Sequence, residues 1–448
     1  MPATDPLRTL YKSLTGKGAL PLEPTDPYYV PILESKPEKD PILALCERID
    51  LAESESVNLL SGFRGNGKST ELLRLKSMLE KSDCRVFLVN MLDYVLMTKP
   101  LALSDFILSL MAALAGAVEA SSDQYLAPLN RSYWERLHDF LDSEVKLEKV
   151  DLEIKGPGIG AKLGLKLKTD PEFKARIQKH LEGHLTRLVQ DARQFIDELV
   201  NEIRRRAHDP DKKVVLLVDS LEQLRGVGEE AGKIYAGVVE LFSGQSANLC
   251  FPKLHVVYTV PPYLKILAPN LGRSLGGHPI TQWPNIHVRD IKNNPDPGGL
   301  ALMESIIEKR FPDWQKIIPQ EFLNQMARSS GGDLRDFFRL IRECVISLRT
   351  ARRASPDALL DKSIVEWVIR QLCNELLPIA YEDARWLARI HKTKQAALHS
   401  DKDLPALARF LDSNLIMNYL NGEPWYDVHP LLIEEIKRGN GTGDGNST

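Results

Sequence analysis

A short stretch of the sequence combines glycine, lysine and hydroxyl side chains at a spacing that suits phosphate chemistry. In SGFRGNGKSTEL, Gly62 is followed after four residues by Gly67, Lys68 and Ser69, with Thr70 next. Glycine lets the backbone curl so that successive N–H groups point at phosphate oxygens. Lys68 would contact the β- and γ-phosphates, Ser69 would ligate magnesium, and Thr70 would reach a phosphate. The predicted phosphate-binding residues are Gly62, Arg64, Gly65, Asn66, Gly67, Lys68, Ser69 and Thr70.

A phosphate-bound metal also needs a carboxylate, and a second apolar run supplies one. In KKVVLLVDSLEQL, the run VVLLV is predicted to be a buried strand that ends in Asp219. A parallel strand delivers such a residue to the sheet edge where ligands bind, so Asp219 is predicted to hold Mg²⁺ together with Ser69. If Asp219 opens a turn, Glu222 faces the same side. Glu222 then either orients an attacking water or is a solvated glutamate at the start of a helix.

Two further polar residues could sense the γ-phosphate. Thr259 lies near the end of the predicted strand KLHVVYTV, where it either contacts the phosphate or only ends the strand before Pro-Pro. In SSGGDLRDFFRL, Ser330 or Asp333 is predicted to cap a helix. Arg335 then lies in the first turn, where a cation gains nothing from the helix dipole. It is either a phosphate contact from a helical lid or an ordinary surface arginine.

The elements around the glycine-rich stretch fit its predicted role. VNLL, directly before it, predicts a short buried strand, and KSTELLRLKSMLEK predicts a helix with one broad apolar face. A strand, a glycine loop and a helix in this order are the context that the phosphate-binding pattern requires. Farther on, WPNIHVRD predicts a fifth strand, NNPDPGG a linker, and GLALMESIIEKRF the start of a helical region.

The order of these motifs along the chain resembles that of AAA+ ATPases. Gly62–Thr70 would be Walker A and Asp219 Walker B, while Thr259 would be sensor 1 and GGDLRD with Arg335 sensor 2. Among these ATPases the motifs resemble most the origin-recognition and STAND-like branches, and the stretch GFRGNGKSTELLRL is similar to bacterial ATP-binding proteins of the STAND-like kind. The resemblance covers roughly residues 43–350. It implies a five-stranded parallel core, a helical lid, ATP with Mg²⁺, and activity tied to assembly or conformational switching.

Two departures from the resemblance affect what it implies. Ser220 stands where many such ATPases have a glutamate, which puts efficient hydrolysis in doubt but not nucleotide binding. The long distance from Lys68 to Asp219 implies an insertion. The candidates for an arginine finger that acts on a neighbouring subunit are Arg273 and Arg289.

The insertion is predicted to contain a hairpin and a long helix. KLEKVDLEIKGPGIGAKLGLKLKTD alternates apolar and charged residues on both sides of GPGIG, with Leu163, Leu165 and Leu167 on the second arm. Such a hairpin could bind DNA or could be a local packing or protein-contact element, and we favour the latter because glutamates offset its lysines. A long amphipathic helix is predicted from about Pro171 to Arg206.

The C-terminal region is predicted to carry a winged-helix-like domain. LIMNYL, the turn NGEP and WYDVHPLL indicate a helix followed by a two-stranded wing. A wing can contact DNA, but acidic residues outnumber the nearby cations here, so docking of a protein is at least as well supported. His429 is predicted to be a packed side chain and not a metal ligand.

These elements predict an α/β fold of the P-loop NTPase class with a five-stranded parallel core sheet. The expected domains are an N-terminal arm (1–42), the ATPase core (43–297, with the insertion at about 120–212), a helical lid (298–375), a winged-helix-like domain (376–439) and a disordered tail (440–448). We expect an ATPase that acts as a nucleotide-dependent switch for a partner protein or for its own oligomerisation. An ATP-dependent DNA-binding loader or regulator is the alternative.

The composition of the chain indicates the kind of partner and the cellular compartment to expect. The chain has 448 residues and a formal net charge of −3, so no whole-molecule attraction to nucleic acid or an anionic membrane is implied. The five cysteines are scattered without zinc or redox spacing, which favours free buried thiols in a reducing compartment. The segment FILSLMAALAGAV is shorter than the roughly 20 apolar residues that span a bilayer. We therefore expect a cytoplasmic protein.

Overall fold

The computed structural model describes the chain from residue 5 to residue 441, apart from residues 17–19, 34–36, 122, 146–158, 171, 174, 177–180, 182, 227, 399 and 421–423. The chain divides into two compact units. One, here called the sheet unit, comprises Pro41–Ser61 and Arg74–Gln282. The other, the lid unit, comprises Met1–Asp40, Gly62–Leu73 and Trp283–Thr448. The predicted phosphate loop therefore belongs to the lid unit, although it follows directly on a strand of the sheet unit.

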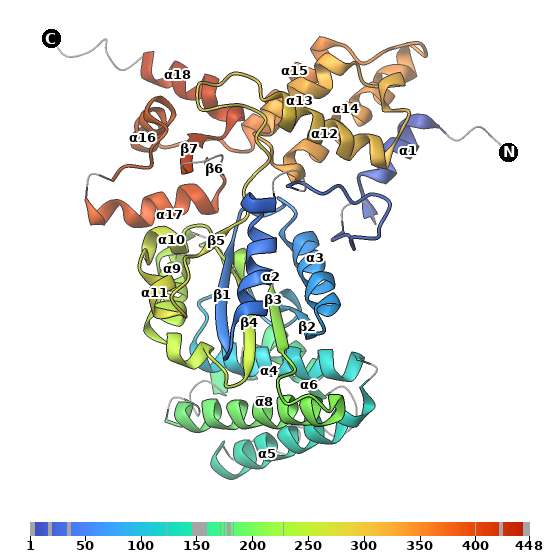
Figure 1. The fold of residues 1–448 in the computed structure, drawn as a ribbon. Coiled ribbons are helices and arrows are strands. Elements are labelled where there is room, and N and C mark those ends of the chain that lie inside the picture. The colour runs from blue at the N-terminus through green and yellow to red at the C-terminus, as the bar shows by residue number, and fades with distance from the viewer. Residues whose placement is uncertain are drawn as a thin grey trace. The chain divides into compact units, whose positions relative to one another are not determined.

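The sheet unit is built on five parallel strands in the order β2-β3-β4-β1-β5 (Figure 1). This confirms the predicted α/β class with a five-stranded parallel sheet. Because all strand pairs are parallel, the carboxyl ends of β1, β3 and β4 lie at one edge of the sheet. The strands are β1 (Ser56–Ser61), β2 (Arg85–Asn90), β3 (Val214–Asp219), β4 (Leu254–Val260) and β5 (Thr281–Gln282).

The central strands form because their sequences suit burial on both faces. Every residue of β3 and β4 is buried, and both strands read as continuous runs of β-branched and aliphatic side chains. The predictions for both strands and for the helix α3 (Lys68–Lys81) are confirmed. Further described helices of this unit are α2 (Pro41–Leu51), α9 (Ala231–Val239), α10 (Leu264–Leu267) and α11 (Leu271–Ser274).

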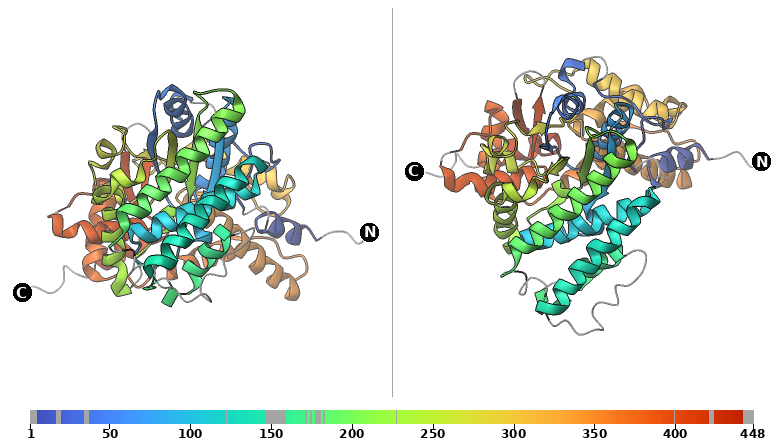
Figure 2. Two further views of the ribbon diagram at one scale, coloured as in Figure 1. Left: turned by 90° about the horizontal axis from the view of Figure 1, so that it is seen from below. Right: turned by 60° about the horizontal axis from the view of Figure 1, so that its bottom comes forward.

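The insertion is helical where the structure describes it. The helix α4 (Leu103–Ala120) packs on β2 and on the helices α6 (Ile159–Thr169) and α8 (Leu185–Ala207). The helix α5 (Ala127–Val145) lies along α8 (Figure 2). Of the described helices, α4 is the one long and apolar enough to cross a membrane, with a mean hydropathy of 1.6, but 72% of it is buried inside the structure. This burial is typical of a core helix.

Three local predictions are wrong or only partly right. The fifth strand is Thr281–Gln282, and WPNIHVRD, which follows it, forms no strand. The second arm of the predicted hairpin is the helix α6, while most of the first arm lies outside the described residues. The predicted long helix is not continuous: described residues between 172 and 181 are helical, but a turn at Gly183 and His184 separates them from α8, which begins at Leu185.

The lid unit is mostly helical, and acidic N-caps start several of its helices. Asp296 and Asp333 each accept a backbone N–H from the first turn of the helix that they cap, α12 and α14. The prediction that Ser330 or Asp333 caps a helix is thus confirmed for Asp333. The helices are α1 (Pro6–Ser13), α12 (Pro297–Arg310), α13 (Gln320–Ser329), α14 (Leu334–Ala354), α15 (Lys362–Asn374), α16 (Tyr381–Thr393), α17 (Leu404–Asp412) and α18 (Ile433–Gly441).

A two-stranded hairpin completes the lid unit, as the sequence predicts. The strands β6 (Ile416–Leu420) and β7 (Pro424–Val428) pair antiparallel. Met417, Tyr419 and Trp425 form a buried cluster on it, in which the rings of Tyr419 and Trp425 stack 4.3 Å apart. Of the predicted disordered tail, residues 440 and 441 belong to α18, and the rest lies outside the described residues.

Candidate nucleotide-binding site

The phosphate loop has the backbone that only glycine adopts easily. Gly65 and Gly67 have φ angles of 82° and 90°, in the left-handed region. At Gly62 the constraint is space, because an added Cβ would lie 2.8 Å from the carbonyl oxygen of Trp283. All three glycines of the predicted pattern are therefore required by the local geometry.

The conformation of the phosphate loop is stabilised by contacts of its own Lys68 and by hydrogen bonds to Trp283. Lys68 is 3% exposed, and its ammonium donates to the carbonyl oxygen of Phe63 and lies 3.4 Å from Asn66 Oδ1. Asn66 and Trp283 exchange two hydrogen bonds: Asn66 Nδ2 donates to the Trp283 carbonyl at 3.1 Å, and the indole Nε1 donates to the Asn66 carbonyl at 2.9 Å. Sequence reasoning missed Trp283, because its role depends on a contact more than 200 residues along the chain.

Arg335, the predicted lid arginine, lies against the phosphate loop. A Cβ added to Gly65 would lie 2.6 Å from Arg335 Cβ and 2.7 Å from its Nε. Leu334, the first residue of α14, also lies near the loop, with Cδ1 3.8 Å from the position of a Cβ on Gly67. The first turn of α14 thus packs on the two glycines whose φ angles are positive. The structure therefore brings together Arg335 and the loop, which lie about 270 residues apart in the sequence.

A pocket lies beside the loop, and the N-terminal arm forms one wall of it. Thr70, a predicted phosphate contact, accepts a hydrogen bond from the Leu22 N–H at 3.1 Å. Glu71, 1% exposed, accepts one from the Tyr29 hydroxyl at 3.4 Å. The lining residues come from the arm, the start of α3 and the helices α12 and α14: Leu22, Tyr28, Tyr29, Val30, Ile32, Gly67, Thr70, Glu71, Ile306, Arg310 and Leu334.

Arg310 connects this arm to the lid helices. Its guanidinium donates to the carbonyl oxygens of Tyr28 at 3.3 Å and Ile306 at 3.0 Å, and it lies over the ring of Phe338 at 4.8 Å. Burial lowers the pKa of Arg310 to about 10, which still leaves the side chain charged at neutral pH. No sequence signal marked Arg310 or the two tyrosines, because their roles come from tertiary packing.

The predicted metal-binding carboxylate, Asp219, and the first predicted sensor residue, Thr259, lie together in the sheet unit. Asp219 ends β3, is 8% exposed, and accepts the Ser220 N–H on Oδ1 at 2.7 Å. Thr259 is fully buried near the end of the neighbouring strand β4. Its hydroxyl accepts the Leu221 N–H at 3.0 Å and donates to the Val218 carbonyl at 3.2 Å. Thr259 therefore fixes the turn that follows Asp219, a role that the sequence did not indicate.

The structure decides one of the two alternatives for Glu222. Ser220 has a φ of 74°, and this left-handed residue turns the chain from β3 into a short 3₁₀ helix, Leu221–Gln223. Glu222 in that helix is 5% exposed. The solvated alternative is thus wrong, and Glu222 is a buried carboxylate three residues after Asp219.

Oxygen ligands are the kind that Mg²⁺ prefers, and the Asp219 carboxylate and Ser69 hydroxyl are of this kind. Among the described residues, no group of three or more His, Cys, Asp and Glu side chains could hold a metal on protein ligands alone. One carboxylate and one hydroxyl suit an ion that takes most of its ligands from phosphate and water oxygens. Within the sheet unit, Asp219 lies at the same edge of the sheet as the carboxyl end of β1.

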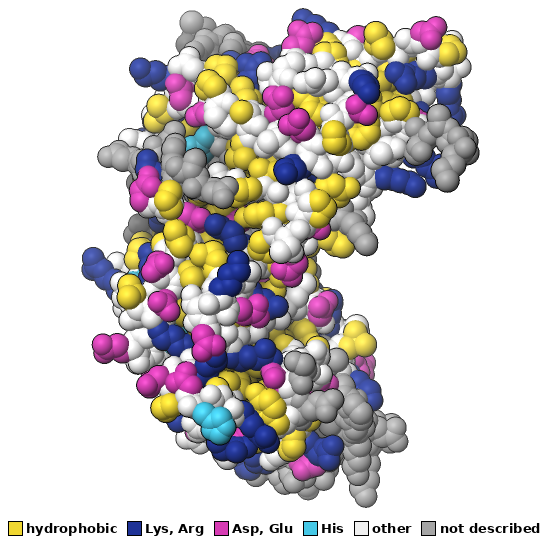
Figure 3. Space-filling model, turned by 45° about the vertical axis from the view of Figure 1, so that its right-hand side comes forward, with side chains coloured by type: hydrophobic (Ala, Val, Ile, Leu, Met, Phe, Trp, Pro, Cys, Tyr) yellow, Lys and Arg dark blue, Asp and Glu magenta, His cyan; other side chains and the backbone are white. Residues whose placement is uncertain are grey.

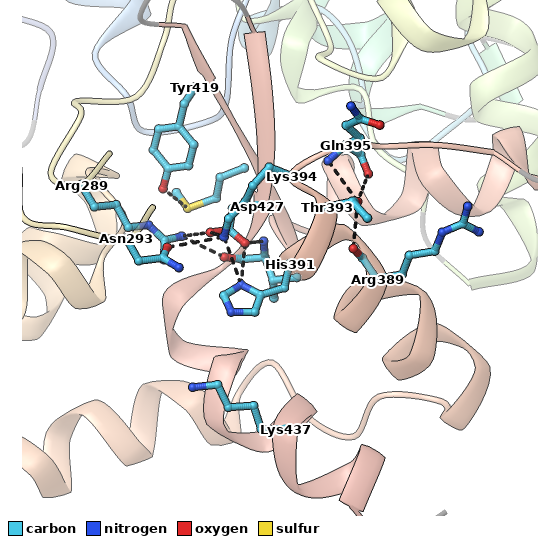
Figure 4. A network of polar contacts seen from close by, with 12 residues as sticks. Arg289, Asn293, Arg389, His391, Thr393, Lys394, Gln395, Tyr419, Asp427 and Lys437 are labelled. Atoms are coloured by element: carbon cyan, nitrogen blue, oxygen red, sulfur yellow. Dashed lines mark hydrogen bonds and ion pairs between the residues drawn. The ribbon is translucent and has the colours of Figure 1, made fainter. Parts of the chain in front are cut away.

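Arg289 is not available as an arginine finger, which corrects one sequence-based candidate. Its side chain is 7% exposed and its guanidinium lies 2.9 Å from Asp427 Oδ2 (Figure 4). Asp427 is fully buried and also contacts Lys394 at 2.6 Å and His391 at 2.7 Å. A finger must reach a neighbouring subunit, whereas this guanidinium is buried in its own chain. Arg273, the other candidate, is exposed on α11.

His429 is buried, as predicted. It is 0% exposed, its Nδ1 accepts the Leu431 N–H at 3.3 Å, and its Nε2 lies 3.1 Å from Asp336 Oδ2. Because Nδ1 accepts, the neutral ring carries its proton on Nε2 and donates it to the carboxylate. The residue thus joins the end of β7 to the first turn of α14.

Comparison with known proteins gives similarity of fold at low sequence identity. No protein-family model matches the sequence, and no curated protein matches it. The chain is similar to the Drosophila ORC bound to DNA, with a TM-score of 0.40 and 12% identity over 98% of this chain and 92% of that chain. It is also similar to the Aeropyrum pernix ORC2 protein in its ADPNP–ADP complexes (TM-score 0.40, 9% identity, 98% and 99% covered) and to the Aeropyrum pernix ORC1 protein in complex with DNA (0.37, 11%, 96% and 97%). At this level of likeness, the role of each residue rests on its own contacts.

Proposed function

We propose that the chain is an ATP-binding protein of the AAA+ type that works as a nucleotide-dependent conformational switch. One observation carries this proposal: the first turn of α14, with Arg335, packs directly on Gly65 of the phosphate loop. A cation at that position lies beside the phosphates and has no gain from the dipole of its own helix. It can bind the γ-phosphate through its planar guanidinium, so the position of α14 would depend on which nucleotide is bound.

The pocket beside the loop would contact part of the base or ribose. Tyr28, Tyr29 and Ile306 give it aromatic and aliphatic walls, and it adjoins Gly67 and Thr70 of the loop. Pockets that bind small molecules are mostly apolar with a few placed polar groups, here Glu71 and Arg310. We therefore assign the arm a part in nucleotide binding, in addition to the loop.

Hydrolysis of ATP to ADP and phosphate is the second part of the proposal. Asp219 and Ser69 would hold Mg²⁺, which when bound neutralises charge on the phosphates. Glu222, buried beside Asp219, would orient the attacking water by accepting its proton. Lys68 would bind the β- and γ-phosphates, and Thr259 would keep the turn of Asp219 and Glu222 in place.

A binding experiment with matched variants tests the proposal. Lys68→Ala and Arg335→Ala should each weaken ATP binding, measured by calorimetry with Mg²⁺, whereas Lys76→Ala on the same helix α3 should not. Lys76 is a suitable control because its side chain is 33% exposed and pairs with Glu80, one turn farther along the helix, at 3.8 Å. Equal ATP affinity of the wild type and Lys68→Ala would refute the site.

The output of the switch is proposed to be assembly with a partner protein or with further copies of the chain, in the cytoplasm. DNA is the second candidate partner, because the hairpin β6–β7 beside helices is a shape that DNA-binding wings use. On the face shown in Figure 3, however, Lys and Arg side chains are interspersed with Asp and Glu among the described residues. Titration of duplex DNA at several salt concentrations with ATP distinguishes the two: a steep loss of binding with salt supports DNA. Absence of binding at low salt supports a protein partner.

A further inference from the structure

Arg64, in the middle of the phosphate loop, forms an ion pair with the C-terminal region. Its guanidinium nitrogen Nη2 lies 3.1 Å from Asp412 Oδ1, with side-chain exposures of 16% and 5%. Asp412 is the last residue of α17, where the helix dipole disfavours a negative charge. A nearby cation offsets this cost, so the position of α17 depends on where the Arg64 side chain lies.

The C-terminal hairpin also holds the second arginine of the site, through the turn before α14. Tyr419 donates its hydroxyl proton to the Gly331 carbonyl at 2.9 Å, and a Cβ on Gly331 would lie 2.4 Å from Met417 Sδ. His429 adds its hydrogen bond to Asp336, the residue after Arg335. Each of the two arginines at the phosphate loop is therefore linked to the C-terminal region, Arg64 through α17 and Arg335 through the β6–β7 hairpin.

We propose that the Arg64 side chain is shared between Asp412 and the γ-phosphate of ATP, so that ATP, but not ADP, releases α17 from the phosphate loop. This inference rests on the proposed ATP site. Arg64 lies within the loop whose backbone would surround the β- and γ-phosphates, so a change of side-chain conformation would let its guanidinium turn from Asp412 toward the γ-phosphate. A phosphate offers a guanidinium two oxygens and carries more negative charge than the carboxylate of Asp412, so it can compete for Arg64. ADP has no γ-phosphate, so with ADP the ion pair persists.

The proposal makes opposite predictions for the two partners. Asp412→Asn removes the competing charge at nearly constant shape, and ATP affinity should rise about tenfold while ADP affinity stays the same. Arg64→Ala should lower ATP affinity about tenfold, again without effect on ADP. In the double variant, Asp412→Asn should give no gain, because the residue that it frees is absent. Asp383→Asn is the matched control: it removes an ion pair of α16 with Arg409 on α17 that does not touch the loop.

Hydrogen exchange gives the structural readout. ATP with Mg²⁺ should increase amide exchange in residues 404–412 of the wild type relative to ADP, and Arg64→Ala should exchange fast with either nucleotide. Unchanged exchange with ATP, or an equal effect of Asp412→Asn on ATP and ADP affinity, would overturn the inference. If Asp412→Asn does not fold, Arg64→Ala provides the same comparison from the other side of the pair. If the wild type instead binds ATP no more tightly than Lys68→Ala does, the proposed function itself is refuted.

Discussion

The buried cluster around Asp427 should control the stability of the C-terminal hairpin, and Asp427→Asn tests this. Asp427 is fully buried and accepts from three side chains: Arg289 at 2.9 Å, Lys394 at 2.6 Å and His391 at 2.7 Å. The substitution keeps the volume but removes the charge, which leaves the cations of buried Arg289 and half-buried Lys394 close together without the carboxylate between them. Breaking a buried ion pair in this way costs about 3–5 kcal/mol. The amide protons of Tyr426 and His429, bonded to Lys394 and Leu415, should then exchange on the order of 10²–10³-fold faster.

The pH dependence of stability provides a second test of the contribution of the Asp427 cluster. Burial alone would raise the pKa of Asp427, but the His391 hydrogen bond and the charges of Arg289 and Lys394 outweigh it and hold that pKa below its usual range. Burial lowers the pKa of Lys394 against the pull of Asp427. For a carboxyl whose pKa is lowered on folding, the stabilisation is present above the unfolded value, about 3.9, and is lost as pH falls through the folded value. The difference between wild type and Asp427→Asn should thus be present at pH 7 and shrink below about pH 4.

Hydrogen exchange measured by mass spectrometry on peptides of β6 and β7 is the assay. Glu434→Gln is the control, because it removes an exposed pair with Lys437 in the same region and should leave the exchange unchanged. Equal exchange rates in Asp427→Asn and the wild type at pH 7 would refute the reasoning, because the cluster would then contribute no net stability to the hairpin.

Three further predictions concern the nucleotide site. Gly65→Ala introduces a Cβ where Arg335 already lies, on a residue with positive φ, and should weaken ATP binding about tenfold or more in calorimetry; unchanged affinity would contradict the packing. Thr70→Val removes the acceptor of the Leu22 N–H and should speed exchange of the arm around that residue; protection equal to the wild type would show that the bond is dispensable. Glu222→Gln should reduce phosphate release roughly 10²-fold while ATP still binds; equal turnover would exclude Glu222 as the base.

The sequence predicts those parts of the fold whose signal is local. The helix Lys68–Lys81 and the strand that ends in Asp219 agree with the structure to the residue, because a phosphate-binding pattern or a buried apolar run marks each of them. The segment IGAKLGLKLKT was predicted to be a strand from its alternation, yet it forms α6. Leucine, lysine and alanine favour helix, and the segment has few β-branched residues that would favour a strand.

Residues that act through long-range contacts could not be predicted. The arm reaches the loop through Thr70 and the lid through Arg310, and nothing in the sequence of the arm indicates either contact. Arg289 was a candidate for an arginine finger, but its partner Asp427, which lies about 140 residues later, buries its guanidinium in the same chain. The contact between Trp283 and Asn66 could not be predicted either, because the two residues lie 217 positions apart in the sequence. Tertiary proximity, and not local pattern, assigns these roles.

The strand order has a consequence for how the chain is synthesised. Ser56 on β1 is paired with His255 on β4, which the ribosome adds 199 residues later. Loop-closure entropy grows only slowly with length, so the delay comes from translation and not from the free energy of pairing. Until β4 emerges, β1 has neither neighbour and the loop after it has no sheet to support it. A nascent chain that stops before Leu254 should therefore be unable to bind ATP, and its exposed strand edges should make it a substrate for chaperones.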